Sequence, residues 1–280
     1  MSDSDSVPHY STGDILLPPS SPPVSPRPAK RKRDGGDEAK VSLATKRKAK
    51  KAKRARPAQD TDVDIENGIN NALGRMDNRL LADYVAQKTK RFESNLSLIE
   101  LGDKHIPERA FRDTSGWEKQ RLLKDLPGFL EHYSSNSGQT KNLSIASKKK
   151  GAPHTIVITS AGLRAADVTR ALRTFQTKES TVAKLFAKHI KLKEAIEFVK
   201  KTRMGIGVGT PSRLIDLLDA GALSLEKLER IVVDSSHIDL KKRGILDMKE
   251  TQQPLMQLLN RPDLKSRYGA VSDGIGLLFY

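Results

Sequence analysis

Two short segments carry side chains that could act on phosphate groups. The sequence TPSR at Thr210–Arg213 follows the apolar run Gly205–Val208, and its proline stands where the leucines after it predict the start of a helix. Backbone amides at a helix start, with nearby hydroxyl and guanidinium groups, can hold a phosphate. Asp234 ends the next apolar run, Arg230–Val233. Nucleotide-dependent enzymes often place a magnesium-coordinating carboxylate at such a position.

Other groups needed for catalysis are missing from the sequence. No glycine is followed by lysine, so a phosphate loop of the form G-x-x-x-x-G-K-[ST] is absent. Cysteine is absent too, which excludes thiolate chemistry and disulfides. His189 and His237 have no second ligand at a metal-binding spacing. We therefore predict no cofactor and no metal site, and we favour a hydrogen bond to a neighbouring loop as the role of Asp234.

Three alternating glycines, Gly205, Gly207 and Gly209, suggest a dinucleotide-binding turn at first sight. The third glycine of that fingerprint would stand at Thr210, and the three glycines lie within a strand rather than after it. We predict that they instead let neighbouring elements approach closely.

Short apolar runs alternate with helical stretches in the second half of the chain. The runs are Thr155–Thr159, Val182–Phe186, Gly205–Val208 and Arg230–Val233, and a helical pattern follows each of the first three. This alternation predicts an α/β fold with a parallel sheet covered by helices. Leu277–Tyr280 is either one more strand or a docked terminus.

The order of these segments resembles the first RecA-like domain of the DEAD-box RNA helicases. Thr210–Arg213 is similar to the family's T-P-G-R motif, Thr155–Phe175 to its motif Ia strand and helix, and Leu185–Lys201 takes the place of its glycine-pair motif. The resemblance spans roughly Pro153–Met248. It implies a single degenerate RecA-like domain of the P-loop NTPase type. It also implies a path for RNA or a partner, with these candidate contacts: Ser160, Arg164, Lys188, Lys191, Thr210, Ser212 and Arg213.

Two of these candidate contacts have alternatives. Arg213 is placed to pair with Asp216 on its own helix. Ala161 stands where the family's motif Ia has an arginine, with Arg164 one helical turn on. A path rebuilt for a protein partner is therefore open beside the RNA path.

Departures from the DEAD-box pattern bear on activity. The D-E-A-D tetrad is replaced by Asp234, Ser235, Ser236 and His237, so a serine stands where the family has the glutamate that polarises water. We also expect no second RecA-like domain before Tyr280, and hence none of its arginines. The resemblance therefore implies a domain without ATPase or helicase activity, and we predict that the protein is not an enzyme.

Residues 1–60 have the composition of a disordered tail. They are rich in serine, proline and charge and poor in aromatic residues, so they cannot bury enough apolar surface to offset chain entropy. Two basic clusters form the pattern of a bipartite nuclear import signal that would bind importin: Lys30, Arg31, Lys32, Arg33, Lys46, Arg47, Lys48, Lys50, Lys51, Lys53, Arg54 and Arg56. A solvated linker is the alternative.

The charge of the whole chain also indicates what kind of partner it binds. A net charge of +16 favours an anionic partner, most commonly nucleic acid. No apolar run is long enough to span a membrane, and the N-terminus has no signal-peptide core, so we expect no membrane partner.

An arm assigned to residues 61–100 separates the tail from the α/β domain, assigned to residues 101–280. Apolar residues recur at helical spacing between Asp62 and Phe92, which predicts an amphipathic helix: Ile65, Ile69, Leu73, Met76, Leu80 and Tyr84. Gly68 and Gly74 each cost about 1 kcal/mol relative to alanine, so the helix needs a surface to pack on. Its own domain and another protein are both open as that surface.

The sequence resembles the Cms-type proteins both in its DEAD-box-like motifs and in its departures from the DEAD-box pattern. They are degenerate DEAD-box-like factors associated with the small-subunit pre-ribosome, and the likeness includes the tail, the arm and the LFAKHIK segment Leu185–Lys191. It implies a non-enzymatic ribosome-biogenesis factor in the nucleus and nucleolus that binds pre-ribosomal RNA, assembly proteins or both. The residues alone leave two alternatives: a nuclear DNA- or RNA-binding factor acting through its tail, and an ATPase with an unorthodox pocket.

Overall fold

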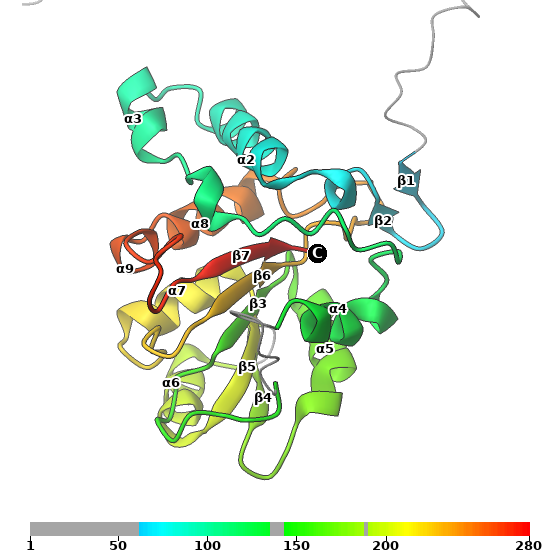
Figure 1. The fold of residues 1–280 in the computed structure, drawn as a ribbon. Helices are drawn as coiled ribbons and strands as arrows, with labels where there is room; N and C mark the ends of the chain where they lie inside the picture. Colours follow the sequence, from blue (N-terminus) through cyan, green and yellow to red (C-terminus); the bar gives the residue numbers. More distant parts are fainter. Residues whose placement is uncertain (1–61, 135–142, 188–189) are drawn as a thin grey trace, which may run out of the picture. The chain divides into compact units, whose positions relative to one another are not determined.

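The computed structural model describes residues 62–134, 143–187 and 190–280 (Figure 1). The predictions for the tail and its import clusters, and those for Lys188 and His189, lie outside these ranges.

A sheet of five parallel strands forms the centre of the domain. Its strands are β3 (Thr155–Ile158), β4 (Thr181–Leu185), β5 (Met204–Gly209), β6 (Arg230–Val233) and β7 (Gly276–Phe279). Their order across the sheet is β4-β5-β3-β6-β7, and every neighbouring pair is parallel. The predicted α/β class with a parallel sheet is confirmed, and the last apolar run is a strand.

Helices cover both faces of the sheet, because strand side chains alternate between two apolar clusters. Ile156 and Ile158 belong to one cluster and Val157 to the other. The first cluster packs under α2 (Asn78–Phe92), α6 (Leu192–Lys201), α7 (Pro211–Asp219) and α8 (Lys249–Leu259), and the second under α4 (Leu126–His132), α5 (Gly162–Ala171) and η5 (Leu172–Phe175). Shorter helices complete the domain: α3 (Leu98–Asp103), η3 (Glu108–Ala110), η4 (Leu123–Asp125) and α9 (Pro262–Lys265).

The alternating glycines of β5 allow close contact with β4 and its flanks. A Cβ atom on Gly205 would lie 2.6 Å from the Ser180 hydroxyl, and one on Gly207 would lie 2.7 Å from a methyl group of Leu185. One on Gly209 would overlap the carbonyl oxygen of Leu185. The predicted packing role of these glycines is confirmed.

The prediction of helix from Asp62 onward is wrong in its first half. Strands β1 (Val63–Asp64) and β2 (Ile69–Asn70) form an antiparallel hairpin, η2 (Leu73–Arg75) follows, and α2 begins only at Asn78. Gly68 adopts a φ of +64° in the turn, a conformation that glycine accepts without strain. The hairpin also gains main-chain hydrogen bonds from the 236–238 segment, which helical periodicity does not detect.

The buried side of α2 also differs from the predicted stripe. Leu80 is 54% exposed, whereas its neighbour Leu81 is fully buried together with Val85. The helix packs against α8, where the Gln252 side-chain amide donates a hydrogen bond to the Thr89 hydroxyl at 3.1 Å. The second half of the arm is thus part of the core of its own domain.

Candidate functional site

The carboxyl ends of the strands bring the predicted site residues to one end of the sheet. Ser160 comes shortly after β3, Thr210 directly after β5, Asp234 directly after β6 and Tyr280 directly after β7. This is the end at which open α/β sheets bind their ligands. The same end is covered on one side by the β1–β2 hairpin, since Ile69 forms a bridge with His237.

Asp234 forms a bidentate ion pair with Arg164. Its Oδ2 accepts from Arg164 Nε at 2.7 Å and its Oδ1 accepts from Nη2 at 3.0 Å. The carboxylate is only 2% exposed. Burial alone would lower the pKa of Arg164, but the hydrogen bonds and charge of Asp234 outweigh burial and raise it. Both carboxylate oxygens are therefore already engaged, and the ion pair holds α5 to the end of β6.

The serines after Asp234 bind the main chain. Ser235 donates from its amide at 2.8 Å and from its hydroxyl at 3.0 Å to the main-chain oxygen of Tyr280, which also accepts from the Ser236 amide at 2.7 Å. The Ser235 hydroxyl thus ties the ends of two neighbouring strands, β6 and β7, together. It does not face an open site, because Ser235 and Tyr280 are both buried.

His237 lies half-buried between the sheet and the hairpin. Burial lowers its pKa, and the positive charge of Arg164 lowers it further. Its ring is therefore held in the neutral form more strongly than that of a free histidine.

The TPSR segment begins α7 as predicted. Thr210 is the N-cap residue, Pro211 occupies the first turn, and the Thr210 hydroxyl makes no capping hydrogen bond. Ser212 is exposed. Arg213 is only 8% exposed: its Nη1 donates to the Ile190 carbonyl oxygen at 3.1 Å, and its Nε is 3.8 Å from Asp216. That Nε is buried and forms no hydrogen bond with the described residues.

The other predicted contact residues differ in their exposure and in whether they already have a partner. Ser160 is partly exposed after β3, and Lys191 is exposed at the start of α6. Arg164, proposed for an RNA path, is instead committed to Asp234. RNA contact by any of these residues stays a prediction.

Sequence reasoning missed Arg121, a buried arginine at the same end of the sheet. Its guanidinium donates to the carbonyl oxygens of Gly74 and Thr114, to the Thr114 hydroxyl and to the Phe279 carbonyl oxygen. Burial lowers its pKa to about 10. It links the 62–76 segment, the 111–121 loop and β7. No sequence signal marks it, because it stands in a polar stretch.

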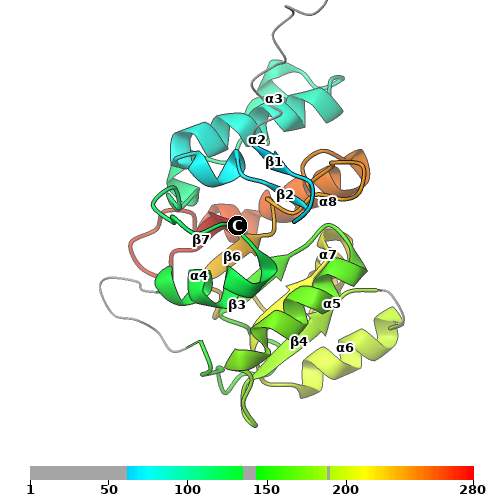
Figure 2. The ribbon, with the colours of Figure 1, turned by 90° about the vertical axis from the view of Figure 1, so that its right-hand side faces the viewer.

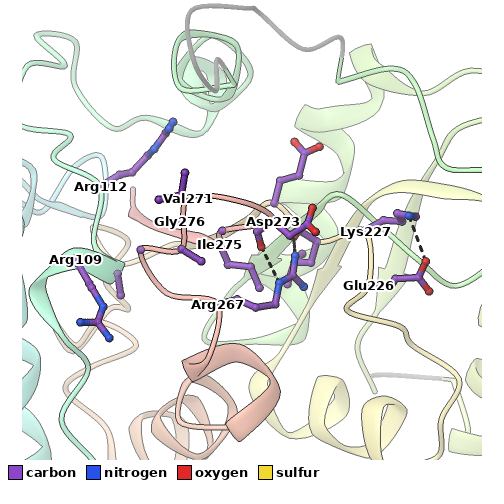
Figure 3. A pocket seen from close by; sticks show the side chains of 15 residues that line it. Arg109, Arg112, Glu226, Lys227, Arg267, Val271, Asp273, Ile275 and Gly276 are labelled. Atoms are coloured by element: carbon purple, nitrogen blue, oxygen red, sulfur yellow. Dashed lines mark hydrogen bonds and ion pairs between the residues drawn. The ribbon is translucent and has the colours of Figure 1, made fainter.

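A cavity of about 740 Å³ lies at the opposite end, beside Gly276 at the start of β7 (Figure 3). Arg267, one of its basic residues, donates to the main-chain oxygens of Leu225, Leu228 and Asp273. This arginine therefore holds surrounding loops in place, and none of the predicted site residues lines the cavity.

Two kinds of feature are absent from residues 62–280 outside the two gaps. No group of three or more His, Cys, Asp or Glu side chains there could hold a metal ion. No helix there is long and apolar enough to cross a membrane.

A family model described as "CMS1: U3-containing 90S pre-ribosomal complex subunit" matches residues 25–280. The chain belongs to the CMS1 family. This CMS1-family chain is 55% identical over 234 residues to Protein CMS1 of Chaetomium thermophilum, covering 84% of this chain and 92% of that protein. It is 32% identical to Protein cms1 of Schizosaccharomyces pombe, over 64% of this chain and 62% of that protein. Human Protein CMSS1 is 28% identical, over 75% and 69%. The resemblance to Cms-type proteins is confirmed.

Solved structures similar to this CMS1-family chain include two yeast proteins. The DEAD-box splicing factor Prp28 matches with a TM-score of 0.36 and 17% identity, over 45% of this chain and 27% of that one. Dbp5 bound to Nup159, Gle1, IP6 and ADP matches with a TM-score of 0.34 and 15% identity, over 58% and 42%.

Proposed function

We propose that this CMS1-family chain is a non-enzymatic ribosome-biogenesis factor of the nucleolus, which binds pre-ribosomal RNA, assembly proteins or both within the small-subunit pre-ribosome. The description of its family as a subunit of the U3-containing 90S pre-ribosomal complex supports the assembly role. A nuclear or nucleolar location follows from such a complex.

The ion pair between Asp234 and Arg164 is the observation that carries the non-enzymatic part. A magnesium ion that took the place of the Arg164 guanidinium at the Asp234 carboxylate would leave that guanidinium, which is itself largely buried, without its partner. Leaving a buried charge without its partner costs about 3–5 kcal/mol. The sequence also has no phosphate loop that could offset this cost by binding nucleotide.

Calorimetry with ATP and Mg²⁺ on the full chain tests this part. We expect no binding tighter than roughly 100 µM, about −5.5 kcal/mol. Ser235→Glu restores the missing carboxylate and should still give no ATP hydrolysis, because the phosphate loop is a separate deficiency. Tighter binding would show that the protein binds nucleotide, and turnover by the unmodified chain would show that it is an ATPase; either result contradicts the proposal.

The RNA part rests on the exposed rim of the sheet's carboxyl end. Three side chains there could each contact a phosphate: the Thr210 hydroxyl, which makes no capping hydrogen bond, and the exposed Ser212 and Lys191. The orphaned Nε of Arg213 adds a buried donor behind this rim. We expect weak binding without sequence preference, since these groups contact the backbone of the nucleic acid rather than its bases.

Salt-dependent RNA titration tests this rim. A chain beginning at residue 57 removes the basic clusters and keeps nearly all of the compact unit Ala55–Tyr280. Lys191→Ala should flatten the dependence of log affinity on log salt by about 0.7 for single-stranded RNA. Lys200→Ala, at the exposed far end of α6, should leave it unchanged. If Lys191→Ala also changes nothing, the rim is a protein-docking surface.

A further inference from the structure

Strand β4 has an open side. It lies at one edge of the sheet, next to β5, and no described residue forms a strand beyond it. The Thr181 amide donates to the Arg203 carbonyl oxygen, on the side of β5, at 3.2 Å. The register shifts between Thr181 and Val182, but the extra residue, Gly205, lies on β5. The successive amides of β4 therefore still point to opposite sides, and those of Val182 and Lys184 face away from the sheet. An edge of this kind can pair with another extended chain.

A groove of about 520 Å³ runs along this open side. Figure 2 shows β4 with α5 and α6 on either side of it. The two helices belong to opposite faces of the sheet, because α5 packs in one apolar cluster and α6 in the other. Apolar side chains from the strand, from α6 and from the segment before it line the groove: Val182, Ile190, Ala195 and Phe198. Phe198 is 42% exposed, so a large aromatic surface lies open there.

Two positive charges line the same groove. Arg173 comes from η5 and Lys184 from β4, and neither side chain forms an ion pair or a hydrogen bond with the described residues. Glu194 is the only acidic residue among the described residues that line the groove, and its carboxylate accepts from the Lys191 amide at the start of α6. The described residues that line the groove therefore carry a net charge of +1, two positive charges against one negative, beside an apolar surface.

We propose that this groove binds an extended, acidic segment of a partner protein, which adds a strand to the open side of β4. Main-chain hydrogen bonds to Val182 and Lys184 would hold the segment. An apolar side chain would cover Phe198, and carboxylates would meet Arg173 and Lys184. The open edge of β4 favours a peptide over RNA, because a second extended polypeptide backbone matches the spacing of its main-chain donors and acceptors. The proposal does not depend on RNA binding at the carboxyl end of the sheet.

Lys184 has a second interpretation that the same experiments decide. An exposed lysine on an edge strand keeps that edge from pairing with other chains. If Lys184 prevents pairing, the Lys184→Ala variant should bind extended peptides more tightly. If Lys184 instead binds the carboxylates of the partner, the same variant should bind them more weakly.

The test selects a displayed library of random 12-residue peptides on the full chain and measures the affinity of the selected peptides by fluorescence anisotropy. We expect selected sequences that alternate apolar and acidic residues. Phe198→Asp and Lys184→Glu should each weaken binding by about tenfold or more. Ile99→Asp, at an exposed apolar position on α3, is the matched control and should leave the affinity unchanged.

Hydrogen exchange of the complex gives a second measurement. A bound strand should slow exchange at the Val182 and Lys184 amides, and a proline at the centre of the peptide should abolish binding by removing a donor. The proposal is overturned if no selected peptide depends on Phe198 and Lys184, if protection appears away from β4, or if Lys184→Ala tightens binding.

Discussion

At the residue scale, the role of Asp234 depends on its partner: the same carboxylate could coordinate magnesium or form an ion pair with an arginine. An aspartate at the end of an apolar strand suits magnesium, yet here both of its oxygens accept from Arg164. A buried ion pair contributes little compared with apolar residues of the same shape, but removing one partner leaves an uncompensated charge.

Asp234→Asn should therefore lower the free energy of unfolding by about 3–5 kcal/mol. The double variant Asp234→Leu with Arg164→Met should recover most of this loss, because it removes both charges. Asp167→Asn disrupts an exposed pair with Arg170 and should change stability by at most about 1 kcal/mol. Urea unfolding measures all three. A small effect of Asp234→Asn would show that the pair is not held as tightly as its geometry implies.

His237 predicts a pH dependence. Its pKa in the folded protein is lowered from the ordinary value of 6.5 by burial and then by Arg164. As the pH falls below about 6.5, the unfolded chain therefore binds the proton first, and the free energy of unfolding decreases. The stability that the neutral His237 contributes is fully present well above pH 6.5. Below that pH, the free energy of unfolding falls by at most about 1.4 kcal/mol per pH unit. His237→Asn should flatten the profile between pH 7 and pH 5 in thermal or urea unfolding. An unchanged slope would contradict this assignment.

At the element scale, the packing of α2 on its own domain determines which of its side chains are buried. Adjacent leucines differ completely: Leu81 is fully buried and Leu80 is largely exposed. Leu81→Ala should lower the free energy of unfolding by about 2–5 kcal/mol, because it leaves a cavity against α8. Leu80→Ala should change it by no more than about 0.5 kcal/mol. Guanidinium unfolding of the two variants compares a buried and an exposed side chain on one helix, and equal effects would mean that α2 does not pack as described.

At the scale of the whole molecule, we predict separable roles for the domain and the tail. Residues Ala55–Tyr280 form one compact unit, so deleting residues 27–56 should leave its unfolding transition nearly unchanged. The same deletion removes both basic clusters and should prevent nucleolar accumulation of a fluorescent fusion. Fluorescence microscopy of the deleted and intact fusions tests this. Continued accumulation would mean that binding by the domain itself concentrates the protein.

Several features were determined by the sequence alone because they depend on neighbouring residues. Apolar runs and the helical patterns between them predicted the parallel sheet, and the alternating glycines of β5 predicted close packing. The missing Gly-Lys pair excluded a phosphate loop without reference to any structure. Local pattern reasoning succeeds in these cases since periodicity and dipeptides are properties of a short stretch of chain.

Only the tertiary structure decided which partners the site residues have. Arg164 and Asp234 are 70 residues apart in sequence, and nothing in either segment indicates that they pair. The hairpin at residues 63–70 replaces a predicted helix because its hydrogen bonds go to the 236–238 segment. Arg121 likewise donates to two distant segments, at Gly74 and Phe279, as well as to Thr114 in its own loop. Contacts of this kind depend on how the folded elements pack together, so periodicity along one segment cannot reveal them.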